Sequence, residues 1–203
     1  MLLRVLSPPA AARAGLLAFM LALAPVPAWP ADPPASIKDK VQLCASCHGP
    51  AGVSAMDNTP SIAAQPDIFL QYQLVFIRDG TRKVEVMQEI AKQLTDDDIR
   101  ALAAYYSSLP PPPPIKPGDH VDSARVNALI QPRHCDSCHK QDFAGQGETA
   151  RLASQREDYL IKALGDFRAG NRRGRGMGTM MEVSVTLKDE DIKLLAAYLA
   201  RQP

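Results

Sequence analysis

The chain has 203 residues, which is enough for one large domain or two small ones. Its 23 basic and 22 acidic residues leave a formal net charge of +1, so the composition does not indicate a nucleic-acid partner. The chain contains 4 cysteines and 4 histidines, and their positions carry most of the functional information.

The first 28 residues are typical of a secretory signal peptide. Arg4 and Arg13 precede an apolar run over 14–24, and cleavage fits after Ala28, with Ala31 as the second choice. The run is short for a membrane span of about 20 residues. An uncleaved anchor, or an association with the membrane surface, is the alternative. No other stretch is long and apolar enough to span, so the mature chain is expected in the periplasm.

The first cysteine motif follows a predicted helix. Ser36 and Asp39 have the spacing of a capping box, which predicts a helix that starts there and runs into the motif. Cys44, Cys47 and His48 form C-x-x-C-H, the attachment signature of a c-type haem. Two thiols one helical turn apart can form thioethers with the vinyl groups of one porphyrin. The histidine then supplies an axial nitrogen to the iron.

Two further helices are predicted before the middle of the chain. Ile68 to Phe76 keep helical spacing, and Gly80 ends that helix. Thr95 and Asp98 are a candidate capping box for the last helix. The predicted apolar face of that helix is Ile99, Leu102, Ala103 and Tyr106. Five consecutive prolines at 110–114 cannot be helical, so they predict an extended spacer and a domain boundary.

The second half of the chain repeats the first. Cys135, Cys138 and His139 form a second C-x-x-C-H motif, so the two motifs account for all 4 cysteines. The similarity extends beyond the motifs: residues 62–65, 78–80 and 94–105 match 152–155, 168–170 and 187–198. The repeated unit is too long for a solenoid, and it predicts two domains.

The predicted fold is all-α, with domains at 32–110 and 120–203 joined by a proline-rich linker at 111–119. The second domain repeats the middle helix over 159–167 and the last helix, whose apolar face is Ile192, Leu195, Ala196 and Leu199. Lys188 stands at the capping position of that last helix and is a poorer cap. Each domain is small for a core of its own, so loss of haem should mean loss of fold.

Other chemistries of four cysteines fit less well. Two C-x-x-C pairs can hold a structural zinc, but that leaves His48 and His139 without a role. Disulfides or thioredoxin-like redox pairs suit an exported chain, but no alternating strand and helix pattern surrounds either pair. Two covalently attached haems are therefore predicted.

Methionine is the common second axial ligand of such a haem and raises its potential. Met87 lies between the middle and last helices of the first half, whereas Met56 lies too near the haem motif. Leu187 matches Leu94 in the repeat, and counting back from it by the same number of residues that separates Leu94 from Met87 gives Met180. Met177 and Met181 are the rivals of Met180 in the second half. The predicted iron ligands are thus His48 with Met87 and His139 with Met180.

The remaining charged residues have simpler interpretations. His120 and His134 have no counterparts in the repeat and are predicted to be exposed. The acidic runs at 96–98 and 189–191 suit the first turns of helices. A cluster of arginines is either a solvated surface, a screen for haem propionates or a docking patch for an acidic partner: Arg168, Arg172, Arg173 and Arg175.

Together these stretches resemble the diheme cytochrome c4 family, which has two class I cytochrome c domains. The resemblance covers nearly all of the mature chain, and CASCHGPAG, PSIAAQ and MQEIAKQLTDDDIRALAAYYSSL are its most specific parts in the first copy. CDSCHK, LASQREDYL and the closing helix carry it in the second copy. It implies two helical haem domains about a pseudo-twofold axis, with haem propionates close together.

The family also implies a proline carbonyl that accepts a hydrogen bond from the proximal histidine ring. Pro60 matches that position, and Ala150 replaces it in the second domain, where the rigid turn is in doubt. Lys140 replaces Gly49 after the second motif. The two haems are therefore expected to differ in potential.

Three classes of function follow. The leading one is a carrier of single electrons between respiratory complexes or dehydrogenases and a terminal oxidase. The second is a dedicated cytochrome subunit of a periplasmic dehydrogenase, such as flavocytochrome sulfide dehydrogenase. The third is a haem peroxidase, which needs an open iron position, and the available methionine pair argues against it.

Overall fold

The computed structural model describes residues 32–115, 122–174 and 176–203, so the predicted signal peptide, His120 and Arg175 lie outside the described residues. The first half contains η1 Ala35–Ile37, α1 Lys38–His48, η2 Pro50–Gly52, α2 Asp67–Arg78, α3 Glu85–Ala91 and α4 Asp96–Ser108. The second half contains α5 Ser123–Ile130, η3 Gln131–Arg133, α6 Cys135–His139, α7 Glu157–Arg168, α8 Gly178–Val185 and α9 Asp189–Leu199.

The described residues form no strand, and the only β contact among them is an isolated bridge between Gln146 and Thr149. The all-α prediction is confirmed. No helix in the described part of the chain is long and apolar enough to cross a bilayer.

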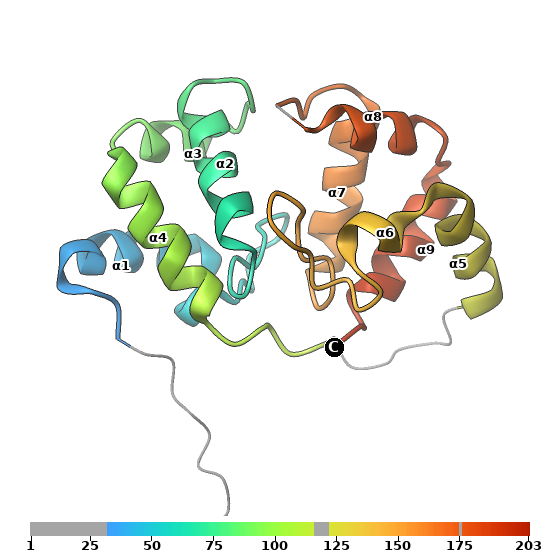
Figure 1. Cartoon of the computed structure of the whole chain (residues 1–203), viewed down its shortest axis with the longest axis horizontal. Coiled ribbons are helices and arrows are strands. Elements are labelled where there is room, and N and C mark those ends of the chain that lie inside the picture. The colour runs from blue at the N-terminus through green and yellow to red at the C-terminus, as the bar shows by residue number, and fades with distance from the viewer. Residues whose placement is uncertain (1–31, 116–121, 175) are drawn as a thin grey trace, which may run out of the picture.

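The two halves repeat the same packing. Helix α2 packs against α3 and α4, and α7 packs against α8 and α9. Figure 1 shows the halves side by side, with α2 and α7 next to each other at the centre and the last helices farther out. The duplicated sequence therefore folds into two similar helical units that meet along their middle helices.

Each half has its own apolar core. The first contains Ile37, Leu70 and the predicted face of α4, and the second contains Val126, Leu160 and the predicted face of α9. The predicted α4 and α9 residues are 0–6% exposed, so both predicted faces are confirmed. Burial of these apolar side chains holds the last helix of each half against its middle helix.

The helix caps agree with the sequence at α4 and α9 but not at α1. Thr95 and Asp98 form the predicted capping box, with hydrogen bonds of 3.0 and 3.1 Å. The Ser36 prediction was wrong, because α1 begins after Ile37 without a side-chain cap. Ile37 is 1% exposed, so packing of this side chain fixes how the chain enters the helix. At α9 the backbone N–H of Lys188 donates to Asp191, but lysine has no oxygen to complete the box.

The helix before the second motif is broken. Helix α1 runs without interruption into His48, whereas its counterpart consists of α5, η3 and the short α6. Pro132 lies in η3, and proline cannot donate an N–H to a continuing helix. His134 then takes a left-handed conformation with φ 50° before α6 begins. It is exposed, as predicted.

The two cores carry an aromatic ring at different positions of the repeat. In the first half Gly52 approaches Tyr106 so closely that an added Cβ would lie 3.0 Å from its ring. In the second half Phe143 takes the place of Gly52 and Leu199 takes the place of Tyr106. The loop thus supplies the ring that α9 lacks at position 199, and Phe143 packs edge-on against Tyr198 of α9 at 6.1 Å between centroids.

Ser184 in α8 is a local defect of the second core. It is 0% exposed, and its hydroxyl has no hydrogen-bond partner among the residues that the structure describes. The corresponding residue in α3 is Ala91, also 0% exposed. Because an unpaired buried hydroxyl is costly, Ser184→Ala should stabilise the folded protein by about 1 kcal/mol. Denaturant unfolding of the haem-loaded protein measures this. Ala91→Ser is the matched control and should destabilise it by a similar amount; a stabilising Ala91→Ser would contradict the assignment.

Two glutamines lock the halves together reciprocally. Gln65 donates to the backbone oxygen of Arg151 at 2.9 Å and accepts from its N–H at 3.0 Å. Gln155, its counterpart in the repeat, makes the same pair of bonds with Ser61, both at 2.8 Å. Both glutamines are buried. The exchange follows a pseudo-twofold axis and fixes the position of one half against the other.

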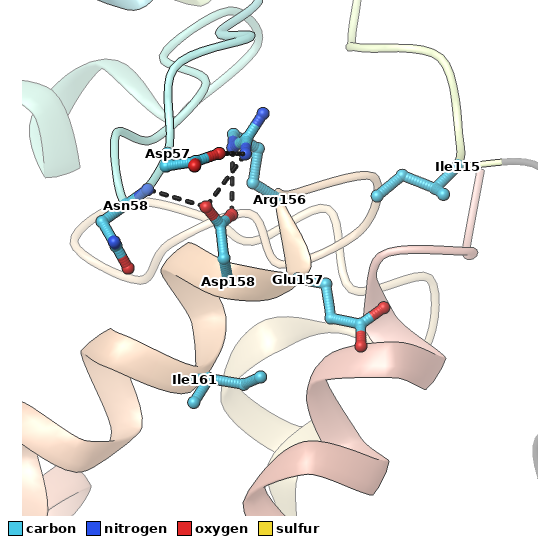
Figure 2. Close-up of a pocket in the computed structure, with 7 residues that line it drawn as sticks. All are labelled: Asp57, Asn58, Ile115, Arg156, Glu157, Asp158 and Ile161. Atoms are coloured by element: carbon cyan, nitrogen blue, oxygen red, sulfur yellow. Dashed lines mark hydrogen bonds and ion pairs between the residues drawn. The ribbon is translucent and has the colours of Figure 1, made fainter.

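Charged groups complete this interface at its edge. Figure 2 shows Arg156 beside Asp158 and directed at Asp57 of the other half, with an Arg156–Asp57 distance of 3.0 Å. Asp158 also accepts the backbone N–H of Asn58 at 2.7 Å. These contacts border an open pocket lined also by Ile115, Glu157 and Ile161. The two halves therefore meet through hydrogen bonds and ion pairs as well as packed side chains.

Candidate functional site

Both C-x-x-C-H motifs end a helix. The first motif, with Cys44, Cys47 and His48, forms the last turns of α1. The second motif makes up the whole of α6, which begins at Cys135 and ends at His139. The helical spacing places the two sulfurs of each motif one turn apart. The structure thus presents two equivalent thiol pairs, one in each half.

The motif histidines are oriented by a backbone carbonyl. His48 Nδ1 lies 2.8 Å from the oxygen of Pro60, and His139 Nδ1 lies 2.8 Å from the oxygen of Ala150. Because a carbonyl can only accept, Nδ1 of each ring carries the proton and Nε2 presents its lone pair. The contact implied for Pro60 is confirmed, and Ala150 makes the same contact without a proline ring.

Burial favours the neutral form of both rings. It lowers the pKa of His48 and of His139, and the hydrogen bonds to Pro60 and Ala150 oppose this only in part. Each histidine is 7% exposed. A neutral imidazole with one nitrogen fixed by a carbonyl is the arrangement found in metal-ligating histidines.

The thiols are not poised for redox exchange. Burial raises the pKa of Cys44 and of Cys135 above the ordinary value for a thiol. Reactive cysteines of thioredoxin-like pairs show the opposite shift. No disulfide joins any two of the four cysteines. Among the described residues, no three histidine, cysteine or acidic side chains are grouped to bind a metal ion by themselves.

The residue after each motif turns the chain sharply. Gly49 has φ 78° and ψ 165°, and Lys140 has nearly the same values, 67° and 163°. Only glycine adopts this region without strain. A Cβ on Gly49 would lie 1.9 Å from the backbone oxygen of Val53. The second loop follows another path, with Gly145 donating its N–H to the oxygen of His139, and it accommodates Lys140.

Relief of this strain is a testable prediction. Lys140→Gly should stabilise the folded protein by about 1 kcal/mol, because the strain of 1–3 kcal/mol exceeds the extra entropy that glycine loses on folding, roughly 0.5–1 kcal/mol. Chemical unfolding of the haem-loaded protein measures the change. Lys140→Ala removes the exposed contact with Asp142 but keeps a Cβ, so it serves as the control. Equal stability of the glycine and alanine variants would contradict the strain.

The two predicted methionine ligands occupy equivalent positions. Met87 is the third residue of α3 and Met180 is the third residue of α8, and both side chains are half-buried. Met56 is 47% exposed in an early loop. The pairing of the two helices thus agrees with the register that selected Met180.

The rivals of Met180 have counterparts that are not methionines. Met181 is the apolar side chain nearest the turn at Gly170. Its methyl carbon would lie 3.8 Å from a Cβ added to Gly170. The equivalent turn at Gly80 is contacted in the same way by Gln88, the neighbour of Met87. Met177 precedes α8 and is 8% exposed; its counterpart is Val84.

The predicted arginine cluster separates into different roles. Arg168 binds the oxygen of Leu187 at 3.1 Å and Asp189 at 2.6 Å. Arg78 makes the same two contacts in the first half, so Arg168 ties α7 to α9. Arg173 is exposed and donates a hydrogen bond to the backbone oxygen of Gly170. These two arginines therefore serve local structure, and of the three that the structure describes, Arg172 is the one buried at the interface.

Sequence reasoning missed the partner of Arg172. Arg82 occupies the equivalent place in the first half, and the two guanidinium groups contact the same two side chains, Gln73 and Tyr159. The repeat itself contained this signal, since Arg82 and Arg172 follow Gly80 and Gly170 by the same number of residues.

Comparison with known proteins agrees with this geometry. Residues 31–105 match the family model described as cytochrome C oxidase, cbb3-type, subunit III, and residues 123–202 match the model described as cytochrome c. Cytochrome c4 of Azotobacter vinelandii is 31% identical over 178 residues, covering 79% of this chain and 84% of that protein.

Two further relatives match a similar share of the chain. The thiosulfate dehydrogenase electron acceptor of Thiomonas intermedia (strain K12) is 31% identical over 185 residues, covering 86% of this chain and 83% of that protein. The crystal structure of reduced recombinant cytochrome c4 from Pseudomonas stutzeri has a TM-score of 0.70 and 29% identity, covering 81% of this chain and 96% of that one.

The family determines the cofactor and the class of activity. Both halves are cytochrome c domains, so the chain carries two covalently attached c-type haems, and the zinc and disulfide alternatives are set aside. The described residues fit these groups, because each half offers a helical thiol pair followed by a neutral, oriented imidazole. The chain therefore belongs to the cytochrome c4 family and acts as a diheme electron-transfer protein, not as an enzyme.

Proposed function

We propose that this chain is a periplasmic relay that carries single electrons from a respiratory complex or dehydrogenase to a terminal oxidase. The observation that supports it most is the reciprocal locking of the two halves by Gln65 and Gln155. Two redox sites held in one fixed arrangement can exchange electrons without a docking step between them. The leader over 1–28 and the family support the periplasmic location.

Four residues of each half are assigned to its haem. Cys44 and Cys47 anchor one group and Cys135 and Cys138 the other, and the bound haem supplies the reversible one-electron chemistry of iron. His48 and His139 would each offer an imidazole nitrogen to the iron, and the carbonyls of Pro60 and Ala150 orient the two rings. Met87 and Met180 would each offer a thioether sulfur to the iron of their own half. Their equal positions in α3 and α8 support this pairing.

The protein's part in electron transfer is to keep these ligands in place. The carbonyl contacts prevent the imidazoles from rotating, and a methionine thioether bound to the iron would exclude water and small oxidants. Little reorganisation is then needed when the charge on the iron changes. The same features disfavour a peroxidase, which needs an open or displaceable position.

A specific donor is suggested by one relative. The Thiomonas protein is named as a thiosulfate dehydrogenase electron acceptor, and the similarity covers 83% of its length. A thiosulfate-oxidising dehydrogenase is therefore the second candidate, with this chain as its acceptor or dedicated cytochrome subunit. A stable subunit would require a larger and more apolar interface than a transient carrier.

Stopped-flow spectroscopy of the haem-loaded protein separates these functions. A carrier should be reduced by catalytic amounts of a quinol-oxidising complex or thiosulfate dehydrogenase and reoxidised by membranes containing a terminal oxidase, without co-elution in gel filtration. Co-elution with the dehydrogenase would identify a dedicated subunit. Failure of every donor to reduce the protein, together with turnover of hydrogen peroxide, would contradict the carrier and restore the peroxidase hypothesis.

A further inference from the structure

A crossed cluster of four side chains lies between α2 and α7. Arg82 donates to Gln73 of its own half at 2.6 Å and to Tyr159 of the other half at 3.2 Å. Arg172 donates to Tyr159 of its own half at 3.4 Å and to Gln73 of the other half at 3.1 Å. Two positive charges are thus held together by two neutral acceptors.

The cluster lacks an anion within the described part of the chain. Neither Arg82 nor Arg172 forms an ion pair with a carboxylate there. Arg172 is only 6% exposed, and its Nε has no hydrogen-bond partner among the described residues. Asp166 attracts Arg172 electrostatically, but its carboxylate is paired with Lys162. Buried charges of one sign are costly unless an opposite charge compensates them.

The local electrostatics show the same imbalance. Burial lowers the pKa of Arg172 to about 10, and the like charge of Arg82 adds to that shift. Burial alone would raise the pKa of Tyr159, but the positive charges of Arg172 and Arg82 lower it to about 8. The shift at Tyr159 indicates a positive field that an anionic group would satisfy, and the shift at Arg172 shows the cost of burying its charge.

The two haem sites border this interface. The carbonyl of Pro60 holds His48, and the next residue, Ser61, is bound by Gln155 of the other half. The carbonyl of Ala150 holds His139, and the next residue, Arg151, is bound by Gln65. Each proximal histidine is therefore anchored one residue away from the contact between the halves. A haem attached at either motif would bring propionate carboxylates, which are anions of the kind that the two arginines lack.

We propose that Arg82 and Arg172 form one shared clamp for haem propionate at the interface, so that the positive charge of either arginine acts on both haems. The clamp rests on the proposed haem assignment and adds a role for two residues that do not bind iron. Gln73 and Tyr159 are positioning residues, because they hold the two guanidinium groups together against their repulsion. The donation across the interface makes the clamp dependent on both domains.

Redox titration of the haem-loaded variants tests the clamp. Arg82→Gln and Arg172→Gln should each lower the midpoint potentials of both haems, because loss of a nearby positive charge favours the more positive, oxidised iron. Arg82→Lys should retain most of the wild-type potentials, since the charge remains although the crossed hydrogen bonds do not. Arg173 is exposed and binds only the backbone oxygen of the nearby Gly170 in the described structure. Arg173→Gln removes the same charge and is therefore the control, which should alter neither potential.

The outcomes distinguish the clamp from the proposed function. If the variants carry two haems and exchange electrons with the donor but keep wild-type potentials, the clamp is wrong and the carrier stands. If Arg82→Lys behaves as Arg82→Gln does, the cluster has only a structural role. If added inorganic phosphate shifts the wild-type potentials but not those of the glutamine variants, the site takes a free anion and the propionate assignment is overturned.

Discussion

Met87→Ala should open the sixth position of one iron, and Met180→Ala should open that of the other. Loss of the thioether removes a ligand that favours reduced iron, and axial ligands move haem potentials over a range of about 0.8 V. The affected haem should therefore fall in potential by something on the order of 0.1 V or more, while the other haem changes little. Each variant should also lose about half of the sulfur-to-iron absorption band in the far red.

Two neighbouring methionines provide matched controls. Met181→Ala and Met177→Ala should leave the far-red band nearly intact, because their counterparts in the first half are Gln88 and Val84. If Met181→Ala removes the second band while Met180→Ala does not, the register between the halves is off by one residue. A wild-type band from only one haem would mean that the other iron is open or differently ligated.

Gly49→Ala should prevent the first domain from folding. The added Cβ would lie 1.9 Å from the oxygen of Val53 and 2.8 Å from its carbon, which are backbone atoms that cannot rotate away. With φ at 78°, the residue is also in a region that alanine avoids. We expect a loss on the order of 4 kcal/mol or more, which is exceptional for one methyl group. Circular dichroism and the haem content of the exported protein measure it.

Gly165→Ala is the control for this substitution. Gly165 lies within α7, and a Cβ there would meet nothing within 4 Å. Alanine is the better helix former by about 1 kcal/mol, so this variant should be slightly stabilised. A Gly49→Ala protein that folds with two haems and normal stability would show that the loop after the first motif is free to move.

Sequence patterns predicted the elements that local chemistry determines. The last helices were found from apolar residues at helical spacing and from the capping box of Thr95, and both are present. The haem motifs were found because thioether chemistry imposes a fixed spacing on Cys44, Cys47 and His48. In each case the signal lies within a few neighbouring residues, so one copy of the sequence contains it all.

Features that depend on distant residues were missed. The Ser36 cap was wrong because packing of Ile37 determines where α1 starts. Gln65 and Gln155 belonged to the recognised repeat, but nothing in their local sequence says that each binds the backbone of the other half. Arg82 was overlooked for the same reason. Its role becomes visible only when α2 and α7 are placed side by side.

The repeat also allows a comparison that a single copy does not offer. Three methionines compete in the second half, and composition does not separate them. The structure supplies an internal comparison, because Gly80 and Gly170 make equivalent turns that Gln88 and Met181 approach in the same way. That equivalence favours Met180 as the counterpart of Met87, and the alanine variants decide it.

The central claim is that one chain holds two covalent haems, one at each C-x-x-C-H motif. Mass spectrometry of the exported protein after extraction with acidified acetone tests it most directly. The polypeptide should retain the mass of two haem groups, and the peptides containing Cys44 with Cys47 and Cys135 with Cys138 should each carry one. A mature protein with one haem or none, or with both groups released by the solvent, would contradict the account.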